Sequence, residues 1–359
     1  MRIKIVFVLA VFFAFPVFSE TLSLPDDSFH HEKNSALSIL RLCTAHDANL
    51  TKDVFSEFGF KILLQKNYGR PSEVIDHTSA YTIGLGKVLI GTETVPAYLI
   101  AIRGTDGNEW YSDFDFSFDA DGQNHFASNF LSSAEDVFLD CISQIKNRNA
   151  VIIVSGHSRG AAVANILALL LNQIYAPSKI YAYTYACPAT VKNISGIEER
   201  NVFNFINPCD LVPNFPLAGW GFRRAGTDVL LDEKSEKISA EKIREAIDSI
   251  LKICPSAESF YRDRHSLVRS GLSENGMTCY ELMMAIGTRL AGLRVDSLET
   301  GRIDLKPLGF KIPSFDTGSD FHELFKYLSH LSRNDGEGFA DLLDEHLPET
   351  YRKKLTECR

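Results

Sequence analysis

Residues 151–171 read VIIVSGHSRGAAVANILALLL, and this stretch indicates the fold of the whole chain. The β-branched run at 151–154 is typical of a buried strand, and an apolar, alanine-rich helical pattern begins after the G-x-S-x-G that is centred on Ser158. Glycines on both sides of the serine let the helix pass close to the strand, so the hydroxyl can stand on a strained turn. Strand, sharp turn and helix together predict a serine presented for nucleophilic attack.

A five-residue motif of this kind also arises by chance, in which case it is an ordinary loop. The buried strand before Ser158 and the small residues after it favour the catalytic interpretation. A serine hydroxyl is a poor nucleophile until a base removes its proton. The backbone N–H of Arg159, which opens the predicted helix, would point toward the negative charge that develops at this serine.

Strands and helices alternate along the rest of the chain. Strand-like apolar runs lie at residues 74–91, 95–102, 179–186 and 202–206. Helical patterns lie at residues 29–65, with a break near 47–49, and at 131–145. This alternation predicts an α/β fold with a mostly parallel central sheet and helices on both faces.

The last eighty residues are helical in pattern and are not separated from the preceding chain by a linker. We therefore expect one domain over residues 20–359, in which residues 281–359 form a helical C-terminal extension. A second domain is the alternative interpretation.

The first nineteen residues, MRIKIVFVLAVFFAFPVFS, have the organisation of a secretory signal peptide. Arg2 and Lys4 precede an apolar run, and Val17 and Ser19 stand at the −3 and −1 positions of the expected cleavage site. An uncleaved anchor is the alternative, but the run is short for a bilayer span. We predict a mature chain that begins near Glu20, is secreted or periplasmic, and has no integral membrane segment after cleavage.

The charge of the chain argues against nucleic acid as a partner. The full sequence carries 37 basic and 46 acidic residues, and loss of Arg2 and Lys4 would lower the net charge from −9 to −11. Such a balance also disfavours electrostatic docking on anionic membranes. The seven cysteines match no zinc-binding spacing, and the chemistry proposed for Ser158 needs neither a metal nor a cofactor.

A serine nucleophile requires a histidine base and a carboxylate that orients the histidine. In α/β-hydrolases both residues follow the serine in the sequence, the carboxylate first and the histidine second. Asp210 lies directly after the strand-like run at 202–206, in a loop with two prolines. It is our candidate acid, with an ordinary turn aspartate as the alternative. A second oxyanion donor is expected at Thr105, because the Arg-Gly-Thr at 103–105 ends a strand.

Four histidines follow Asp210 in the sequence, at His265, His322, His330 and His346. We predict His265 as the base, because its surroundings have no regular helical pattern, as expected for a loop at the sheet edge. His322 and His330 lie on a helix whose other residues face a core, which favours structural roles. His346 lies near the C-terminus, and a surface position is the alternative for each of the four.

Taken together, these motifs resemble the class 3 lipases. The residues that carry the resemblance are the Arg-Gly-Thr at 103–105, Trp110 with Asp113, the G-H-S-x-G at 156–160, Asp210 with Val212 and Pro213, and Gly221 with Phe222. The similarity covers about residues 80–270 and departs from the family at Arg159, Ala161 and Arg224. It implies an α/β-hydrolase fold, a triad of Ser158, Asp210 and His265, and an oxyanion hole at Thr105 and Arg159.

The resemblance implies a secreted serine hydrolase that cleaves carboxylic esters of lipids through an acyl-enzyme, as triacylglycerol lipases do in lipid degradation. The substrate would be a lipid ester, with a lipid–water interface as one setting for the reaction. A phospholipase A1 or a short-chain esterase with the same triad is the first alternative. An inactive α/β-hydrolase scaffold that binds lipid or protein is the second, and the intact Ser158 and Asp210 argue against it.

Overall fold

The computed structural model of the chain describes residues 20–68, 78–104, 126, 128–192, 194–208, 210, 212–214, 222–231 and 345–357. One eight-stranded sheet lies at the centre of these residues. Its strands are β1 (Ser23–Leu24), β2 (Lys61–Lys66), β3 (Tyr81–Ile90), β4 (Glu93–Ile102), β5 (Val151–His157), β6 (Ile180–Tyr185), β7 (Val202–Ile206) and β8 (Thr227–Leu230).

The strand order is β1-β3-β4-β5-β6-β7-β8, with β2 paired to β3. Each neighbouring pair from β4 to β8 is parallel, whereas β2 with β3 and β3 with β4 are antiparallel. The predicted mostly parallel sheet is therefore confirmed. Parallel strands place their carboxyl ends at one edge of a sheet, and in open α/β sheets this edge is where ligands bind.

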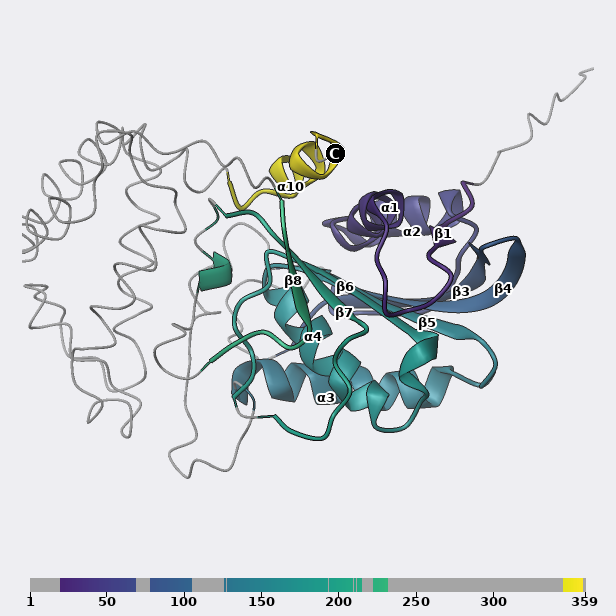
Figure 1. Cartoon of the computed structure of the whole chain (residues 1–359). Helices are drawn as coiled ribbons and strands as arrows, with labels where there is room; N and C mark the ends of the chain where they lie inside the picture. Colours follow the sequence, from purple (N-terminus) through teal and green to yellow (C-terminus); the bar gives the residue numbers. More distant parts are fainter. Residues whose placement is uncertain are drawn as a thin grey trace, which may run out of the picture.

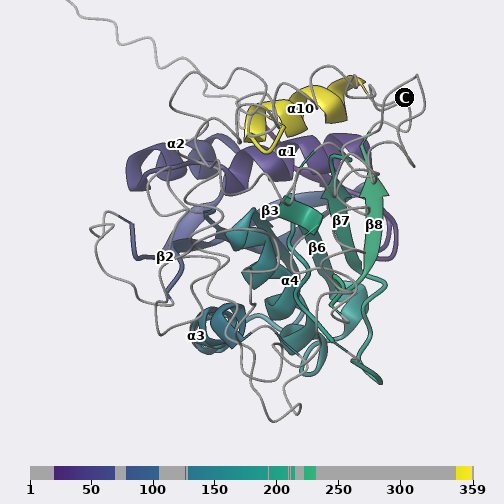
Figure 2. The same cartoon turned by 90° about the vertical axis from the view of Figure 1, so that its left-hand side faces the viewer.

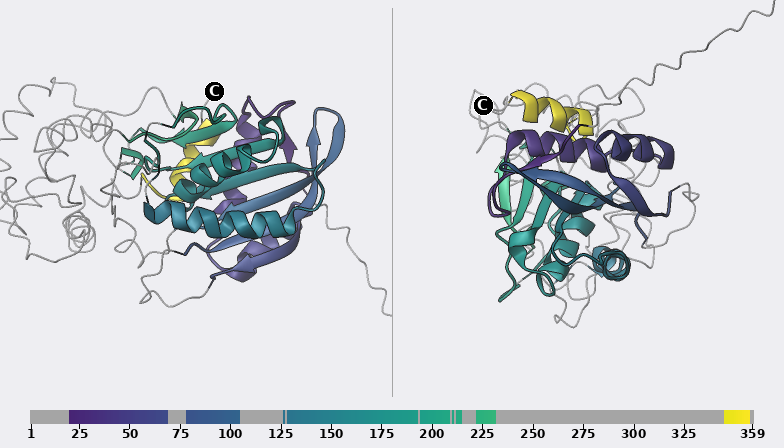
Figure 3. Two further views of the ribbon diagram at one scale, coloured as in Figure 1. Left: turned by 90° about the horizontal axis from the view of Figure 1, so that it is seen from below. Right: turned by 90° about the vertical axis from the view of Figure 1, so that its right-hand side faces the viewer.

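Helices cover both faces of the sheet, as predicted (Figure 1). The helices are α1 (Lys33–Cys43), α2 (Ala48–Glu57), α3 (Ser128–Gln144), α4 (Arg159–Asn172) and α10 (Pro348–Glu357). Figures 2 and 3 show α1, α2 and α10 together on one face and α3 and α4 on the other. This arrangement, with a strand–turn–helix at the centre of the sheet, is the α/β-hydrolase fold.

The alternation of side chains along the central strands builds one core on each face. In β4, Ile100 belongs to the core beneath α3 and α4, whereas the adjacent Leu99 belongs to the core beneath α1. Successive strand residues point to opposite faces, so a strand covered on both sides is apolar throughout. Every residue of β5, β6 and β7 is accordingly buried.

The N-terminal helical pattern is only partly realised. The predicted break is present, because Asp47 caps α2 by accepting the backbone N–H groups of Asn49 and Leu50. The expected continuation to residue 65 was wrong, since Gly59 at φ 71° turns the chain out of α2 and residues Lys61–Lys66 form β2. A short apolar run such as 62–64 is compatible with either a helix or a strand. Here the hydrogen-bonded pairing with β3 stabilises the strand.

The helix α10 lies inside the segment predicted as a C-terminal extension, and it packs beside α1 (Figures 1 and 2). Tyr351 and Leu355 of α10 are buried in the core beneath α1, and Lys33 of α1 donates to the carbonyl of Thr356 at 2.7 Å. Residues 281–344 and the signal-peptide segment 1–19 lie outside the described residues, so the domain boundaries stay a prediction. Within the described ranges, no helix combines the length and apolarity that a bilayer span requires.

Candidate active site

Ser158 stands on a sharp turn between β5 and α4. Its backbone has φ 57° and ψ −128°, a conformation that L-residues rarely adopt. The turn is held from both sides, because the Ser158 N–H donates to the carbonyl of Tyr185 in β6 at 2.9 Å and the Ser158 carbonyl accepts from Ala161 and Ala162. Such strain persists only where surrounding structure imposes it, and here it holds the serine at the carboxyl end of β5.

The two glycines of the motif are required by close backbone contacts. A Cβ on Gly156 would lie 2.2 Å from the Gly160 carbonyl oxygen, and one on Gly160 would lie 2.4 Å from the Ile102 carbonyl oxygen. Gly104 approaches from β4, since a Cβ there would lie 2.8 Å from the His157 carbonyl oxygen. The helix, the strand before it and the neighbouring strand can meet this closely only without side chains.

Asp210 lies at the same sheet edge, in the loop that follows β7. Its side chain is fully buried, and its Oδ1 accepts the backbone N–H of Val212 at 2.9 Å. The loop also closes on itself, because the Asp210 N–H donates to the carbonyl of Asn207 at 3.0 Å. A buried carboxylate must be hydrogen-bonded, and these contacts leave its Oδ2 facing the serine side of the site.

His346 lies between these two side chains. Its Nδ1 is 2.7 Å from Asp210 Oδ2, and its Nε2 is 2.9 Å from Ser158 Oγ. A carboxylate can only accept, so Nδ1 carries the ring proton and donates to Asp210, which leaves Nε2 free to accept the serine hydroxyl. Serine, histidine and carboxylate are thus connected in the order that nucleophilic catalysis by serine requires.

The two distances correct the sequence prediction, which placed His265 at this position. His265 lies outside the described residues, and the position between Ser158 and Asp210 belongs to His346. The physical reason is the docking of α10 on α1, which carries the residues just before the helix to the sheet edge. A sequence signal existed: Pro348 is the first residue of α10, and proline there marks a helix start, so His346 is a loop residue.

Comparison with protein families agrees with the motif-based resemblance. Residues 99–220 match the sequence model of the family described as lipase (class 3), and the matched segment contains Ser158 and Asp210. The match covers about one third of the chain, and this segment is similar to the class 3 lipases. His346 lies beyond the matched segment, so its place in the site comes from the structure alone. No curated protein matches the chain.

Solved structures to which the chain is similar include two lipases and an MDLA variant. A triacylglyceride lipase of Rhizomucor miehei is 19% identical, covering 55% of this chain and 79% of its own, with a TM-score of 0.43. A lipase of Rhizopus microsporus var. chinensis is 18% identical, covering 55% and 74%, with a TM-score of 0.42. An MDLA variant of Penicillium cyclopium is 21% identical, covering 57% and 81%, with a TM-score of 0.41.

The oxyanion site that the sequence predicts includes the start of α4. Arg159 is the first residue of α4, as predicted, and the N–H groups of a first helical turn have no acceptor within the helix. Thr105, the second predicted donor, lies outside the described residues. Gly104, immediately before it, brings the end of β4 against the turn, since a Cβ there would lie 3.5 Å from Ser158 Cβ.

A second histidine, His157, packs against His346. It precedes Ser158, is 7% exposed, and its ring centroid lies 5.0 Å from that of His346. Burial, together with the neighbouring His346, lowers the pKa of His157 well below its ordinary value, while a hydrogen bond to the His346 backbone acts in the opposite direction. His157 therefore remains neutral and contributes no charge next to the base.

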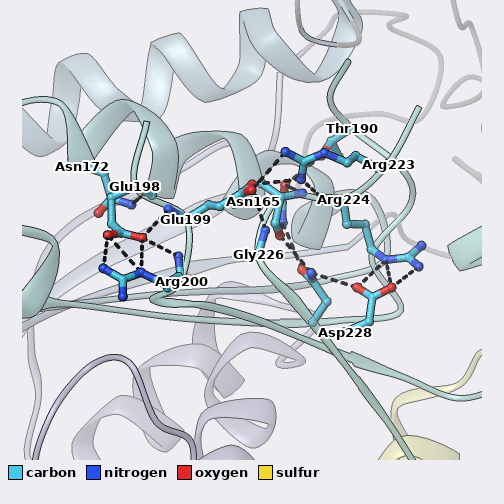
Figure 4. Close-up of polar contacts among 12 residues, drawn as sticks. Asn165, Asn172, Thr190, Glu198, Glu199, Arg200, Arg223, Arg224, Gly226 and Asp228 are labelled. Atoms are coloured by element: carbon cyan, nitrogen blue, oxygen red, sulfur yellow. Dashed lines mark hydrogen bonds and ion pairs between the residues drawn. The ribbon is translucent and has the colours of Figure 1, made fainter. Parts of the chain in front are cut away.

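Arg224 ties the loop of the acid to its neighbours at a position where class 3 lipases often have histidine. Its Nε donates to Asp228 Oδ1 at 2.9 Å (Figure 4). Its Nη1 donates to the carbonyls of Cys187 and Pro213. The Asp228 carboxylate also accepts from Asn204, which belongs to a buried amide network under α4. The guanidinium thus joins the loops after β6 and β7 to β8.

Metal ligation has no candidate among the described residues. These residues contain no cluster of three or more histidine, cysteine, aspartate or glutamate side chains arranged to hold an ion. Cys187, near the end of β6, is a buried free thiol, and burial raises its pKa to about 12. It is therefore protonated and a poor ligand or nucleophile.

Proposed function

We propose that the chain is an exported serine hydrolase that cleaves carboxylic esters of lipids through an acyl-enzyme on Ser158, with His346 as base and Asp210 as acid. The observation that supports it most directly is the connection of the three side chains at 2.9 and 2.7 Å, around a serine held on a strained turn. The family match supports the ester substrate.

In the first half-reaction, Ser158 Oγ attacks the ester carbonyl carbon while its proton passes to His346 Nε2. The carbonyl oxygen becomes an oxyanion, which the N–H of Arg159 at the start of α4 would stabilise, with Thr105 as the proposed second donor. Asp210 balances the imidazolium charge. The intermediate then collapses, the C–O bond to the alcohol breaks, and the leaving alcohol takes the proton from His346.

In the second half-reaction, water attacks the acyl carbon and gives its proton to His346 Nε2. The second tetrahedral intermediate expels Ser158 Oγ, which recovers that proton, and the fatty acid leaves. The chain needs no metal or cofactor for either half-reaction. The family resemblance favours a long acyl ester as the proposed substrate.

A covalent label and a substrate panel test the proposal. A fluorophosphonate probe should modify wild-type protein at Ser158 and leave Ser158→Ala unmodified. The variant should keep its thermal unfolding temperature and lose on the order of 10⁴-fold or more in kcat. Retention of more than a tenth of the turnover by folded Ser158→Ala would exclude Ser158 as nucleophile.

The panel should contain triacylglycerols, phospholipids and short p-nitrophenyl esters, so that the leaving group and the acyl length vary separately. Preference for a long-chain triacylglycerol supports the lipase proposal. If only phospholipids or only short esters were hydrolysed, the proposed triad would stand and the proposed substrate class would be wrong. Labelling without turnover of any ester would favour a binding scaffold.

Export is part of the same proposal. The basic residues Arg2 and Lys4 before the apolar run, and Ser19 at the expected cleavage site, support it. N-terminal sequencing of protein recovered outside the cell should begin near Glu20. Recovery of a membrane-bound chain that retains Met1 would contradict it.

A further inference from the structure

Two donors share a single oxygen of the candidate acid. Asp210 Oδ2 accepts from His346 Nδ1 at 2.7 Å and also from the Tyr351 hydroxyl at 2.7 Å. The motifs that identify Ser158 and Asp210 do not include Tyr351, which is on α10, 141 residues from the carboxylate that it contacts. The orientation and charge of Asp210 therefore depend on a tyrosine outside the triad.

The position of the Tyr351 hydroxyl is fixed from several directions. Its ring is fully buried, and the ring of His157 lies edge-on to it with centroids 5.6 Å apart. Its oxygen also accepts the backbone N–H of Asn207 at 3.2 Å. Burial, and after it the charge of Asp210, raises the pKa of Tyr351 well above its ordinary value. The phenol thus keeps its proton and acts as the donor to Asp210.

We propose that Tyr351 is a positioning residue of the active site, whose hydroxyl fixes the Asp210 carboxylate and limits the negative charge that Oδ2 presents to His346. This inference rests on the proposed serine-hydrolase function. A hydrogen bond to a charged acceptor withdraws electron density from it, and two donors on one oxygen weaken each other's bond. Tyr351 thereby sets how strongly Asp210 stabilises the protonated imidazole.

Several other titratable or charged groups lie around the imidazole of His346. The groups that face the His346 ring, or the residues in contact with it, come from four parts of the chain. They are His157 at the end of β5, Asp210 after β7, Arg224 beside β8, and Glu345, Tyr351 and Lys354 of the C-terminal segment. Glu345 and Lys354 pair with each other, and Arg224 pairs with Asp228. Removal of the Tyr351 hydroxyl alters none of these pairs directly.

The variant Tyr351→Phe keeps the buried ring and removes only the donor. Without it, Asp210 Oδ2 would concentrate its charge on His346 and favour the imidazolium. The acidic limb of the kcat/KM profile should then move to higher pH, by roughly half a unit. The less constrained carboxylate should also lower kcat at the plateau by about tenfold, with KM little changed.

A purely structural role for Tyr351, as an anchor of α10, predicts a different result. Anchoring depends on the ring, so the phenylalanine variant would change neither the pH profile nor kcat. Tyr181→Phe is the matched control, because Tyr181 is also buried, at 2% exposed, and its hydroxyl donates to the Pro25 carbonyl at 3.2 Å, away from Ser158 and Asp210. It should keep the wild-type profile and kcat.

The experiment measures kcat, KM and the pH profile of kcat/KM for the full-length wild type, Tyr351→Phe and Tyr181→Phe, with thermal unfolding recorded for each. A shifted limb and reduced kcat in Tyr351→Phe alone support the proposal. Folded Tyr351→Phe that behaves as Tyr181→Phe overturns it. Ser158→Ala in the same series separates the two proposals, since activity in that variant would refute the serine mechanism itself.

If Tyr351→Phe does not fold, protein with 3-fluorotyrosine at position 351 tests the same proposal. Fluorine makes the phenol a stronger donor and leaves the ring and the hydroxyl in place. The acidic limb should then move to lower pH, opposite to the direction expected for the loss of the hydroxyl. An unchanged profile in the fluorinated protein overturns the proposal.

Discussion

The proposed nucleophile, Ser158, and the proposed base, His346, are positioned by two regions of very different construction. The β5–α4 turn is continuous in sequence and is held by backbone contacts among β4, β5, β6 and α4. The base segment, residues 345–357, reaches the same sheet edge by packing on α1, and its histidine is 188 residues from the serine that it contacts. The turn is therefore held by contacts close to it in the fold, whereas the base segment depends on contacts between parts of the chain that are far apart in sequence.

This difference means that the β5–α4 turn is part of the sheet structure, whereas the base segment is added to it and completes the site. The turn is surrounded by strands that are buried on both faces, so it cannot move without the sheet. The base segment is attached through two buried side chains of α10, through Lys33, and through the loop of Asp210. We therefore expect the base to be lost before the nucleophile when the protein is destabilised.

The largest expected effect is the loss of the base. His346→Ala should reduce kcat on the order of 10⁴-fold, as fully as Ser158→Ala, because triad members act as a unit. His265→Ala should retain activity. Kinetics of the three purified variants, with circular dichroism to verify the fold, make the comparison. An inactive His265→Ala beside an active His346→Ala would return the base to the position that the sequence prediction gave it.

Loss of a docking side chain is the next largest effect. Leu355→Ala should cost about 3 kcal/mol of α10 packing, because the side chain is 2% exposed. We expect its activity to fall at a lower temperature than its circular dichroism signal. Leu171→Ala, at a fully buried position near the end of α4, is the matched control, and its activity should persist until global unfolding. Coincident loss of both signals in Leu355→Ala would show that the base segment is no separate unit.

A smaller effect is expected from crowding the turn. Gly156→Ala would press a methyl group against the Gly160 backbone and should lower the free energy of unfolding by about 2–3 kcal/mol. Its activity and its circular dichroism signal should decline together. Gly196→Ala is the control, because its φ of 76° carries strain while no atom lies within 4 Å of the added Cβ. A cost for Gly156→Ala no larger than that of the control would contradict the steric account.

The smallest effect is a change in pH dependence at the contact between the two regions. His157 has a lowered pKa in the folded state, so below about pH 6.5 the unfolded chain takes a proton that the folded chain refuses. The free energy of unfolding therefore decreases as pH falls below about 6.5. His157 contributes up to about 1.4 kcal/mol per pH unit to this decrease. His157→Gln should have a shallower slope in urea unfolding between pH 6.5 and 5, and a parallel one above pH 7.5.

The contrast also explains which features the sequence could predict. The turn around Ser158 was predictable, because strand, glycines and helix are adjacent and their requirements are local. Asp210 was predictable from its place after a buried strand, since parallel strands end at a common edge. Thr105 and the signal peptide lie outside the described residues and remain predictions.

The base was not predictable by the same means. Its position depends on the burial of Tyr351 and Leu355 against α1, a contact between segments some three hundred residues apart, such as Lys33 with Thr356. Spacing and periodicity carry no signal for such a contact, although Pro348 marked His346 as a loop residue before a helix. The boundary between α2 and β2 failed for a related reason, because pairing with β3 overrides an ambiguous local pattern.

The position of the base near residue 346 has a consequence for the cell that makes this protein. Synthesis runs from the N-terminus, so Ser158 and Asp210 leave the ribosome well before His346, which is 136 residues beyond the aspartate. A nascent chain therefore carries a serine without its proposed base until residue 346 has been made. The proposed activity on lipid esters would therefore arise only after His346 had been made and had docked beside Ser158 and Asp210.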